Sequence, residues 1–199
     1  MTLNRRAPEI WIGDDASTLA REGARRVAEA ARRAISQRGR FILVLSGGNT
    51  PRRLFRILAA EEHGVDWGRV DFLFSDERMV SHEDPESNYH MARETLLDHI
   101  PAKAERTHPM PTELAPEQAA AAYEATVRAV LDPKDPRPDL VLLGMGPDGH
   151  TASIFPGSRL LRHDGPLTGA PLSDAGPRPA RSARSAKFET EPLVAAVLD

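Results

Sequence analysis

The sequence predicts an α/β fold built on an open, mostly parallel sheet that is flanked by helices. Three apolar runs carry this prediction: residues 41–45 (FILVL), 70–75 (VDFLFS) and 139–143 (DLVLL). Continuous apolar character is typical of strands that are covered on both faces, and segments with helical periodicity lie between the runs. Strands that alternate with helices of this length form parallel βαβ units.

The N-terminal part is expected to hold a short strand and a long helix. Residues 9–12 (EIWI) are apolar enough to predict the strand. From 17 to 37, small or apolar residues recur at every fourth position with arginines between them, which predicts one amphipathic helix. Asp14 or Asp15 is the expected N-terminal cap of this helix, and Gly39 is its expected stop.

Three more helices are expected along the chain. One begins at Pro51, because proline is favoured in the first turn of a helix. A second is expected over 88–99, after a polar loop, and a third opens at Pro116. Residues 132–138 (DPKDPRP) form a turn-rich connector into the last buried strand. The apolar stripe of the helix that begins at Pro51 comprises Leu54, Phe55 and Leu58. That of the helix that opens at Pro116 comprises Ala120, Tyr123, Val127 and Val130.

The composition changes beyond residue 162, so the chain divides into three parts. Residues 1–162 are expected to form one α/β domain, 163–188 a flexible segment rich in Pro, Gly and Arg, and 189–199 an apolar, strand-like terminus. Basic residues at every third position of 178–187 would suit an anionic partner, but a solvated linker is the favoured interpretation. These residues are Arg178, Arg181, Arg184 and Lys187.

Composition and charge exclude several classes of function. Charged residues make up 28% of the chain and the net charge is −3, which gives no electrostatic argument for nucleic acid or an anionic membrane as partner. The absence of cysteine excludes disulfides, thiolate metal sites and cysteine nucleophiles. No histidine pair has metal-ligand spacing beside a carboxylate, so no metal is expected. The first residues lack the apolar stretch of a signal peptide, and we expect a cytoplasmic protein.

The loops that follow the three buried strands carry the candidate chemistry. Ligands bind beyond the carboxyl ends of the strands in an open α/β sheet, so these loops are expected to share one site. In the first loop, SGGNT, two glycines and a helix start favour an anion such as phosphate. A tight turn capped by Asn49 or Thr50 is an equal alternative, and the absence of a P-loop lysine disfavours a nucleoside triphosphate. The candidate binding residues are Ser46, Gly47, Gly48, Asn49 and Thr50.

The second loop, SDER, places two carboxylates and a guanidinium directly after a buried strand. Asp76 and Glu77 are candidate substrate-binding residues. Arg78 is a candidate catalytic residue, because its guanidinium can bind a phosphate or carboxylate through two hydrogen bonds. The alternative is a surface turn in which Arg78 pairs with Asp76 or with a nearby helix.

The third loop, GMGPDGHT, has the glycine spacing of a dinucleotide-binding fingerprint, but Pro156-Gly157 interrupts the helix that such a site needs. A glycine-rich active-site loop is the favoured interpretation. His150 is the candidate for proton transfer, which imidazole performs well near neutral pH, and Asp148 would orient the loop or the imidazole. A structural histidine bonded to a nearby carbonyl is the alternative. The remaining candidate binding residues are Gly144, Gly146, Gly149 and Thr151.

Together the three motifs point to a family. LSGGNTPRRLFRIL, FLFSDERMVSHEDPESNYHMARETLL and DLVLLGMGPDGHTASIFPGS resemble the 6-phosphogluconolactonases in order and spacing, across residues 9–160. This family resembles the glucosamine-6-phosphate deaminases in fold, so a deaminase is the serious alternative. Deaminases continue after Asp-Gly-His with Ile-Ala-Phe-Asn-Glu-Pro. Residues 151–156 read TASIFP, which favours the lactonase.

The resemblance implies a Rossmann-like fold and hydrolysis of 6-phosphoglucono-δ-lactone to 6-phosphogluconate, in the pentose phosphate pathway and without a cofactor. His150 would activate water for attack on the lactone carbonyl. Backbone N–H groups of the glycine loop, or Arg78, would stabilise the developing oxyanion. The SGGNT loop would hold an anionic part of the sugar-phosphate substrate.

The chain departs from the family pattern at its C-terminal end. Family members continue with further α/β structure and a basic segment, so the fold is expected to lack its C-terminal part. We expect an unpaired sheet edge, which would favour self-association where a complete chain would be a monomer, and weak catalysis. The alternative from another class of function is therefore a remnant that binds sugar phosphates and has little catalytic activity.

Overall fold

The computed structural model describes residues 9–158, residue 161 and residues 193–196. The segment 163–188, with the predicted basic stripe, lies outside the described residues, and so does most of 189–199. None of the described helices is both long and apolar enough to cross a membrane.

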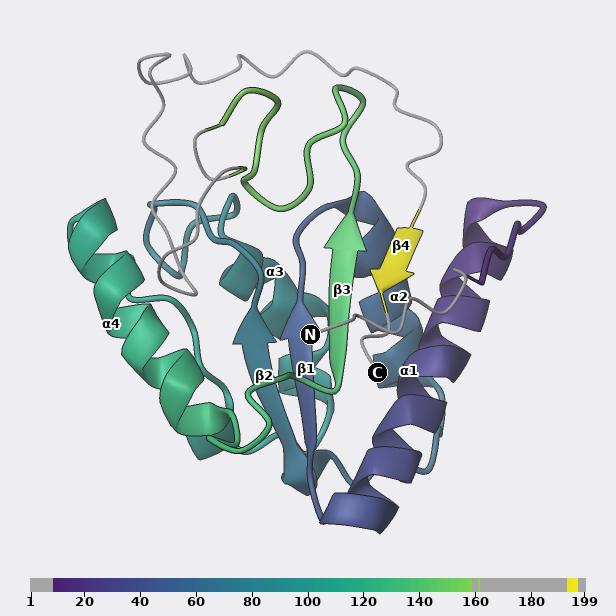
Figure 1. Ribbon diagram of the computed structural model, residues 1–199. Coiled ribbons are helices and arrows are strands. Elements are labelled where there is room, and N and C mark those ends of the chain that lie inside the picture. The colour runs from purple at the N-terminus through teal and green to yellow at the C-terminus, as the bar shows by residue number, and fades with distance from the viewer. Residues whose placement is uncertain (1–8, 159–160, 162–192, 197–199) are drawn as a thin grey trace.

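Four strands form one sheet in the order β2-β1-β3-β4 (Figure 1). The three predicted runs form β1 (Phe41–Leu45), β2 (Val70–Phe74) and β3 (Leu140–Gly144), and β1 pairs in parallel with both neighbours. β4 (Leu193–Ala196), in the predicted apolar terminus, pairs antiparallel with β3. The predicted open, mostly parallel α/β sheet is confirmed.

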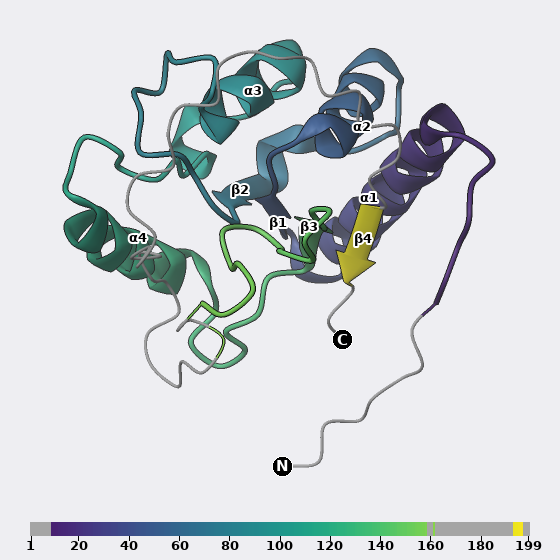
Figure 2. The same cartoon turned by 90° about the horizontal axis from the view of Figure 1, so that it is seen from above.

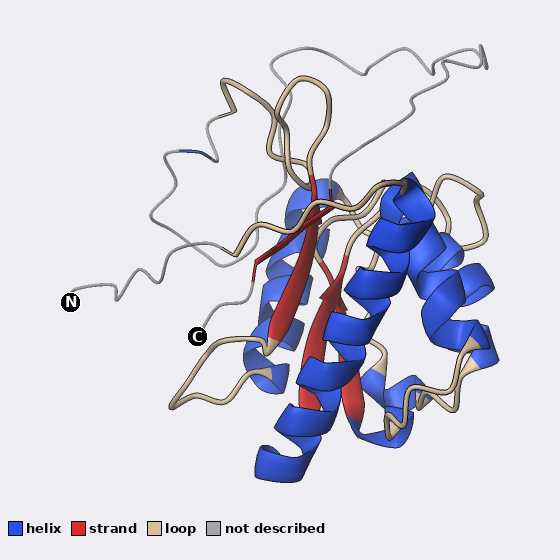
Figure 3. Ribbon diagram, turned by 90° about the vertical axis from the view of Figure 1, so that its right-hand side faces the viewer, coloured by secondary structure: helices blue, strands red, loops and turns tan. Residues whose placement is uncertain are grey.

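Helices cover both faces of this sheet (Figures 2 and 3). Viewed from above, α1, α2 and α3 follow one face, and α4 lies against the other. One-turn 3-10 helices supplement them in the connections. The α-helices are α1 (Ala16–Arg38), α2 (Asn49–Ala60), α3 (Asn88–Thr95) and α4 (Pro116–Val130), and the 3-10 helices are η1 (Trp67–Arg69), η2 (Leu97–His99) and η3 (Ala104–Arg106).

The two faces of β1 enter two separate hydrophobic clusters. Phe41, Leu43 and Leu45 are buried in the larger cluster, together with residues of α1, α2 and α3. Ile42 points to the opposite face and is buried with Tyr123 of α4 in the smaller cluster. Alternate residues of a strand face opposite sides, so an uninterrupted apolar run is what a strand between two helical layers requires.

Both ends of α1 follow the predicted capping chemistry. The carboxylate of Asp15 accepts a hydrogen bond from the backbone N–H of Thr18 at 2.7 Å, so Asp15 is the N-cap. Gly39 ends the helix in the left-handed region at φ 76°, and its N–H donates to the carbonyl of Ile35. These local signals explain why the predicted helix is confirmed almost to the residue.

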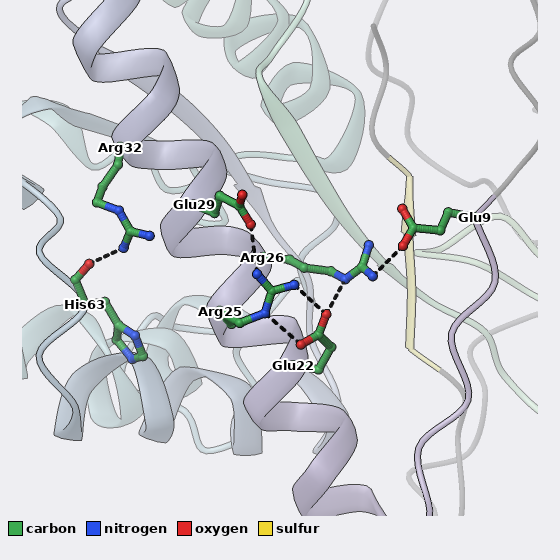
Figure 4. Close-up of polar contacts among 7 residues, drawn as sticks. All are labelled: Glu9, Glu22, Arg25, Arg26, Glu29, Arg32 and His63. Carbon is green, nitrogen blue, oxygen red and sulfur yellow. Dashed lines mark hydrogen bonds and ion pairs between the residues drawn. The ribbon is translucent and has the colours of Figure 1, made fainter.

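The predicted strand at residues 9–12 is wrong. In the described part of the chain this segment pairs with no strand, and Ile10 and Ile12 are 80% and 86% exposed. Arg26 of α1 instead donates to the carboxylate of Glu9 at 2.6 Å, which holds the segment beside the helix (Figure 4). Apolar character alone does not form a strand, because a strand also needs a partner for its backbone groups.

The helix predicted over 88–99 is shorter than expected. α3 ends at Thr95, where Leu96 leaves helical geometry at φ −141° and ψ −64°, and the 3-10 helix Leu97–His99 follows. The Thr95 hydroxyl donates to the carbonyl of Met91 at 2.6 Å, and such a bond competes with the backbone ladder.

The outer edge of β2 is covered by groups from other elements. The backbone N–H of Phe74 donates to the Tyr123 hydroxyl at 2.7 Å, and the N–H of His108 donates to the carbonyl of Phe72 at 3.0 Å. Burial of the Tyr123 hydroxyl raises its pKa. These contacts satisfy strand groups that a bare edge would leave unpaired.

Candidate active site

The three candidate loops meet at one edge of the sheet. β1, β2 and β3 are parallel, so their carboxyl ends point the same way, and each leads directly into its loop. Figure 1 shows the loop after β3 (green) above this edge. The predicted convergence of the loops is confirmed, and specific side chains join them.

Asn88, the first residue of α3, joins the first loop to the second. Its side chain is almost fully buried, and its Nδ2 donates to the backbone carbonyl of Asp76 at 3.0 Å and to the Asp76 carboxylate at 3.2 Å. On its other side it lies against Gly47, where a Cβ atom would come within 1.9 Å of the Asn88 Oδ1. Gly47 is therefore required for close packing. The sequence reasoning did not identify Asn88, although it lies within the quoted motif.

Ser153 joins the third loop to the second. Its hydroxyl donates to Oδ2 of Asp76 at 2.8 Å, across 77 positions of sequence. The hydroxyl of Ser75 and Nδ2 of Asn88 contact Oδ1 of the same carboxylate, both at 3.2 Å. Asp76 is therefore the point at which the three loops are connected, and Ser153 is a second residue that the sequence reasoning missed.

The Glu77 carboxylate binds the start of α3. It accepts hydrogen bonds from the backbone N–H groups of Asn88 and Tyr89 at 2.7 and 2.8 Å, and from the Ser87 hydroxyl at 3.0 Å. A carboxylate at this position satisfies free amide groups and complements the helix dipole. The structure thus gives Glu77 a capping role at the start of α3, and its contact with substrate stays a prediction.

Arg78 lies on the exposed side of the second loop. Its Nη1 donates to the backbone carbonyl of Glu86 at 2.7 Å, which bridges the two ends of the loop. Within the described residues it forms no ion pair with Asp76, so the predicted alternative of an Arg78–Asp76 surface pair is not observed. A guanidinium held by one hydrogen bond keeps further donors for an anion.

The first loop forms the start of α2. Gly48 is the N-cap at φ 107° and provides no side-chain cap, so the alternative in which Asn49 or Thr50 caps the turn is not observed. Ser46 is only 5% exposed, and its hydroxyl lies 3.5 Å from the carbonyl of Gly47. The structure places Asn49 and Thr50 at a helix start suited to an anion, with Ser46 buried beneath it.

His150 is held by Asp148 within a tight turn. Oδ1 of Asp148 forms a hydrogen bond with Nδ1 of the imidazole and also accepts from the backbone N–H of His150 at 3.3 Å. The hydrogen bond from His150 keeps the pKa of the Asp148 carboxyl below its usual value. The backbone carbonyl of His150 accepts from the N–H of Gly146 at 2.8 Å. Within the described residues the recorded hydrogen-bond partner of the ring is the Asp148 carboxylate, so the predicted structural alternative, a ring bonded to a neighbouring carbonyl, is not observed there.

Nε2, the other ring nitrogen of His150, is available for proton transfer. The imidazole is 29% exposed and packs on Phe155 with ring centroids 4.7 Å apart. In the part of the chain that the structure describes, Nε2 has no hydrogen-bond partner. A carboxylate bonded to Nδ1, with no recorded partner for Nε2 among the described residues, is the arrangement of an imidazole base and its orienting group.

The residues after His150 are held in an unusual conformation. Ala152 has φ 46°, in the left-handed region that residues with a side chain rarely adopt. The Thr151 hydroxyl is buried and has no hydrogen-bond partner among the described residues. Thr151, a predicted binding residue, is partly buried, and its role in binding stays a prediction.

Comparison with known proteins finds a matching family and relatives with the same fold. The family described as glucosamine-6-phosphate isomerases/6-phosphogluconolactonase matches residues 14–187. The 6-phosphogluconolactonases of Mycobacterium leprae and Synechocystis are 36% and 38% identical, and each alignment covers 86% of this chain and 72% of the relative. Among solved structures, the Trypanosoma brucei 6-phosphogluconolactonase is 27% identical with a TM-score of 0.71, covering 96% of this chain and 76% of that one.

The chain is shorter than these relatives. Against the 6-phosphogluconolactonase structure from Thermotoga maritima, the match covers 68% of this chain but 60% of that chain, at 31% identity and a TM-score of 0.63. The region that the family model matches, residues 14–187, contains the sheet edge, all three loops and the Asp148–His150 pair. From its sequence and its fold, the chain belongs to the 6-phosphogluconolactonases.

Proposed function

We propose that this chain hydrolyses 6-phosphoglucono-δ-lactone to 6-phosphogluconate. The observation that carries the proposal is the imidazole of His150, oriented by Asp148 at the carboxyl edge of the sheet, with Nε2 directed away from that contact. Relatives named 6-phosphogluconolactonase support the choice of substrate. The same proposal places the reaction in the pentose phosphate pathway and in the cytoplasm.

The geometry supports a general-base mechanism. Nε2 of His150 removes a proton from a water molecule as the water oxygen attacks the lactone carbonyl carbon. The bond between that carbon and the ring oxygen then breaks, and the imidazolium returns the proton to the departing oxygen. Asp148 keeps the imidazole in one orientation and stabilises its protonated form, the role that a carboxylate has beside other histidine bases.

Two features of the site stabilise negative charge, one on the transition state and one on the substrate. Backbone N–H groups of the glycine loop, or the guanidinium of Arg78, stabilise the oxyanion that forms on the carbonyl oxygen. The start of α2 at Asn49 and Thr50 holds an anionic part of the substrate. Asn88 donates to Asp76 and packs against Gly47, so it fixes the start of α2 relative to the second loop.

A lactonase assay with a background correction tests the proposal. The lactone also hydrolyses spontaneously, so the measured quantity is the rate of lactone disappearance with protein minus the rate without it. Binding of 6-phosphogluconate is measured in parallel by calorimetry. Enzyme-dependent hydrolysis supports the proposal, whereas product binding without hydrolysis would identify a sugar-phosphate-binding remnant.

A second assay on the same protein preparation distinguishes a lactonase from a glucosamine-6-phosphate deaminase. Glucosamine-6-phosphate is supplied as the substrate, and ammonia release is measured. We expect none above background, because residues 151–156 read TASIFP and lack the Asn-Glu pair with which deaminases continue after Asp-Gly-His. Ammonia release at a rate above that of lactone hydrolysis would reverse the assignment.

A further inference from the structure

We propose that Ser153 is a positioning residue, which holds the His150 loop in its working conformation through the hydrogen bond to Asp76. The inference deepens the proposed function and rests on it. Ser153 does not touch the reacting atoms in this scheme. It acts through the backbone between itself and His150.

The partner of Ser153 is firmly anchored. Asp76 lies two residues beyond the end of β2, and the buried side chain of Asn88 binds both its backbone carbonyl and its carboxylate. The Ser153 hydroxyl reaches the free side of this carboxylate at 2.8 Å. The bond therefore connects the third loop to a point that the sheet and α3 already hold in place.

The third loop needs such an anchor. Ala152 is in the left-handed region, which is strained for a residue with a side chain, and the Thr151 hydroxyl is buried without a partner among the described residues. A turn in which the N–H of Ile154 donates to the Thr151 carbonyl at 2.9 Å closes around Ala152. Both features favour rearrangement of the loop, and strain of this kind persists only where the surroundings over-determine it.

His150 lies at the other end of the same short segment. Its hydrogen bonds to Asp148 and Gly146 are with residues of the same loop, so they do not connect the loop to β2. The Ser153–Asp76 hydrogen bond connects the loop to the residues that follow β2. Loss of the bond should let the imidazole sample positions away from the substrate.

Two variants of Ser153 and one control test the inference. Ser153→Ala removes the hydroxyl, and Ser153→Thr keeps it. Ser81→Ala is the matched control, because the Ser81 hydroxyl also forms a hydrogen bond in a strand-end loop, accepting from the N–H of Glu83 at 3.3 Å, but this bond does not join two loops. For each variant, kcat and KM are measured for the lactone, and the His150 ring signals are followed by NMR.

The expected results separate positioning from folding. Ser153→Ala should lower kcat by about tenfold or more with KM within about twofold, because misplacement of a catalytic group chiefly affects the chemical step. Its His150 signal should shift or broaden, whereas Ser153→Thr and Ser81→Ala should retain parental kcat and parental ring signals. Parental kcat in Ser153→Ala, or failure of Ser153→Thr to restore it, would overturn the inference.

The NMR measurement keeps this test distinct from that of the proposed function. If the parent protein hydrolyses no lactone, the proposed function fails, but the ring signals of His150 still report whether Ser153 fixes the loop. An unchanged His150 signal in Ser153→Ala would then overturn the positioning role independently of any activity.

Discussion

Gly146 and His150 lie so close together that a Cβ atom on Gly146 would come within 2.1 Å of Cε1 in the His150 ring. The imidazole therefore occupies the space that any other residue at 146 would fill. We predict that Gly146→Ala pushes the ring out of position and lowers kcat/KM by about a hundredfold, as a displacement of about 1 Å can.

Gly68→Ala is the matched control for this change. A Cβ there would meet the ends of two side chains, Asp66 at 3.3 Å and Lys103 at 3.4 Å, and Gly68 precedes β2, at the opposite end of the strand from the second loop. Steady-state kinetics with circular dichroism as a fold check measures both variants. Equal activity of Gly146→Ala and Gly68→Ala would contradict the close-packing argument.

His150→Ala tests the general base directly. We expect a loss of about 10²–10⁴ in rate, the usual contribution of such a group, while the affinity for 6-phosphogluconate is retained. The measurement is the background-corrected rate of lactone disappearance, with product binding by calorimetry. A variant with parental activity would remove His150 from the mechanism.

Arg78→Ala tests the guanidinium at the end of β2. A hydrogen bond to a charged group is typically worth about 1.5–3 kcal/mol, so kcat/KM should fall about ten- to hundredfold. If Arg78 binds the phosphate, the loss shrinks for an unphosphorylated lactone, and an equal loss on both substrates assigns it to the reacting carbonyl. No loss on either substrate would leave Arg78 only its contact with the Glu86 carbonyl.

Glu22 on α1 should stabilise the protein in a pH-dependent way. Hydrogen bonds from Arg25, with a further contribution from Arg26, lower the pKa of Glu22 from 4.5 to about 2 against the opposing effect of burial (Figure 4). A lowered pKa means that the stabilisation is present above the unfolded value of 4.5 and is lost as the pH falls through about 2.

Melting temperatures of Glu22→Gln measure this contribution. At pH 7 we expect a loss of about 1 kcal/mol, or roughly 2–4 °C, which shrinks as the pH falls from 4.5 toward 2. Glu62→Gln, an exposed residue near the end of α2, is the control and should melt with the parent. A Glu22→Gln difference that stays constant down to pH 2 would show that the ion pairs are not its cause.

Local patterns in the sequence determined the secondary structure and the edge at which the site lies. β1, β2 and β3 were predictable because each is a continuous apolar run of strand length, and α1 because its periodicity is bounded by Asp15 and Gly39. Each of these signals depends on neighbouring residues only. The convergence of the loops followed from parallel strand order, which is a topological rule and needs no side-chain geometry.

The tertiary structure alone decided which polar residues hold the site together. Ser153 and Asp76 are 77 positions apart, and no local pattern distinguishes their contact from a solvent-exposed serine and aspartate. The capping role of Glu77 likewise depends on where α3 begins relative to the second loop. Residues 9–12 have the composition of a strand, but a strand needs a partner for its backbone groups, and long-range packing alone determines whether one is in place.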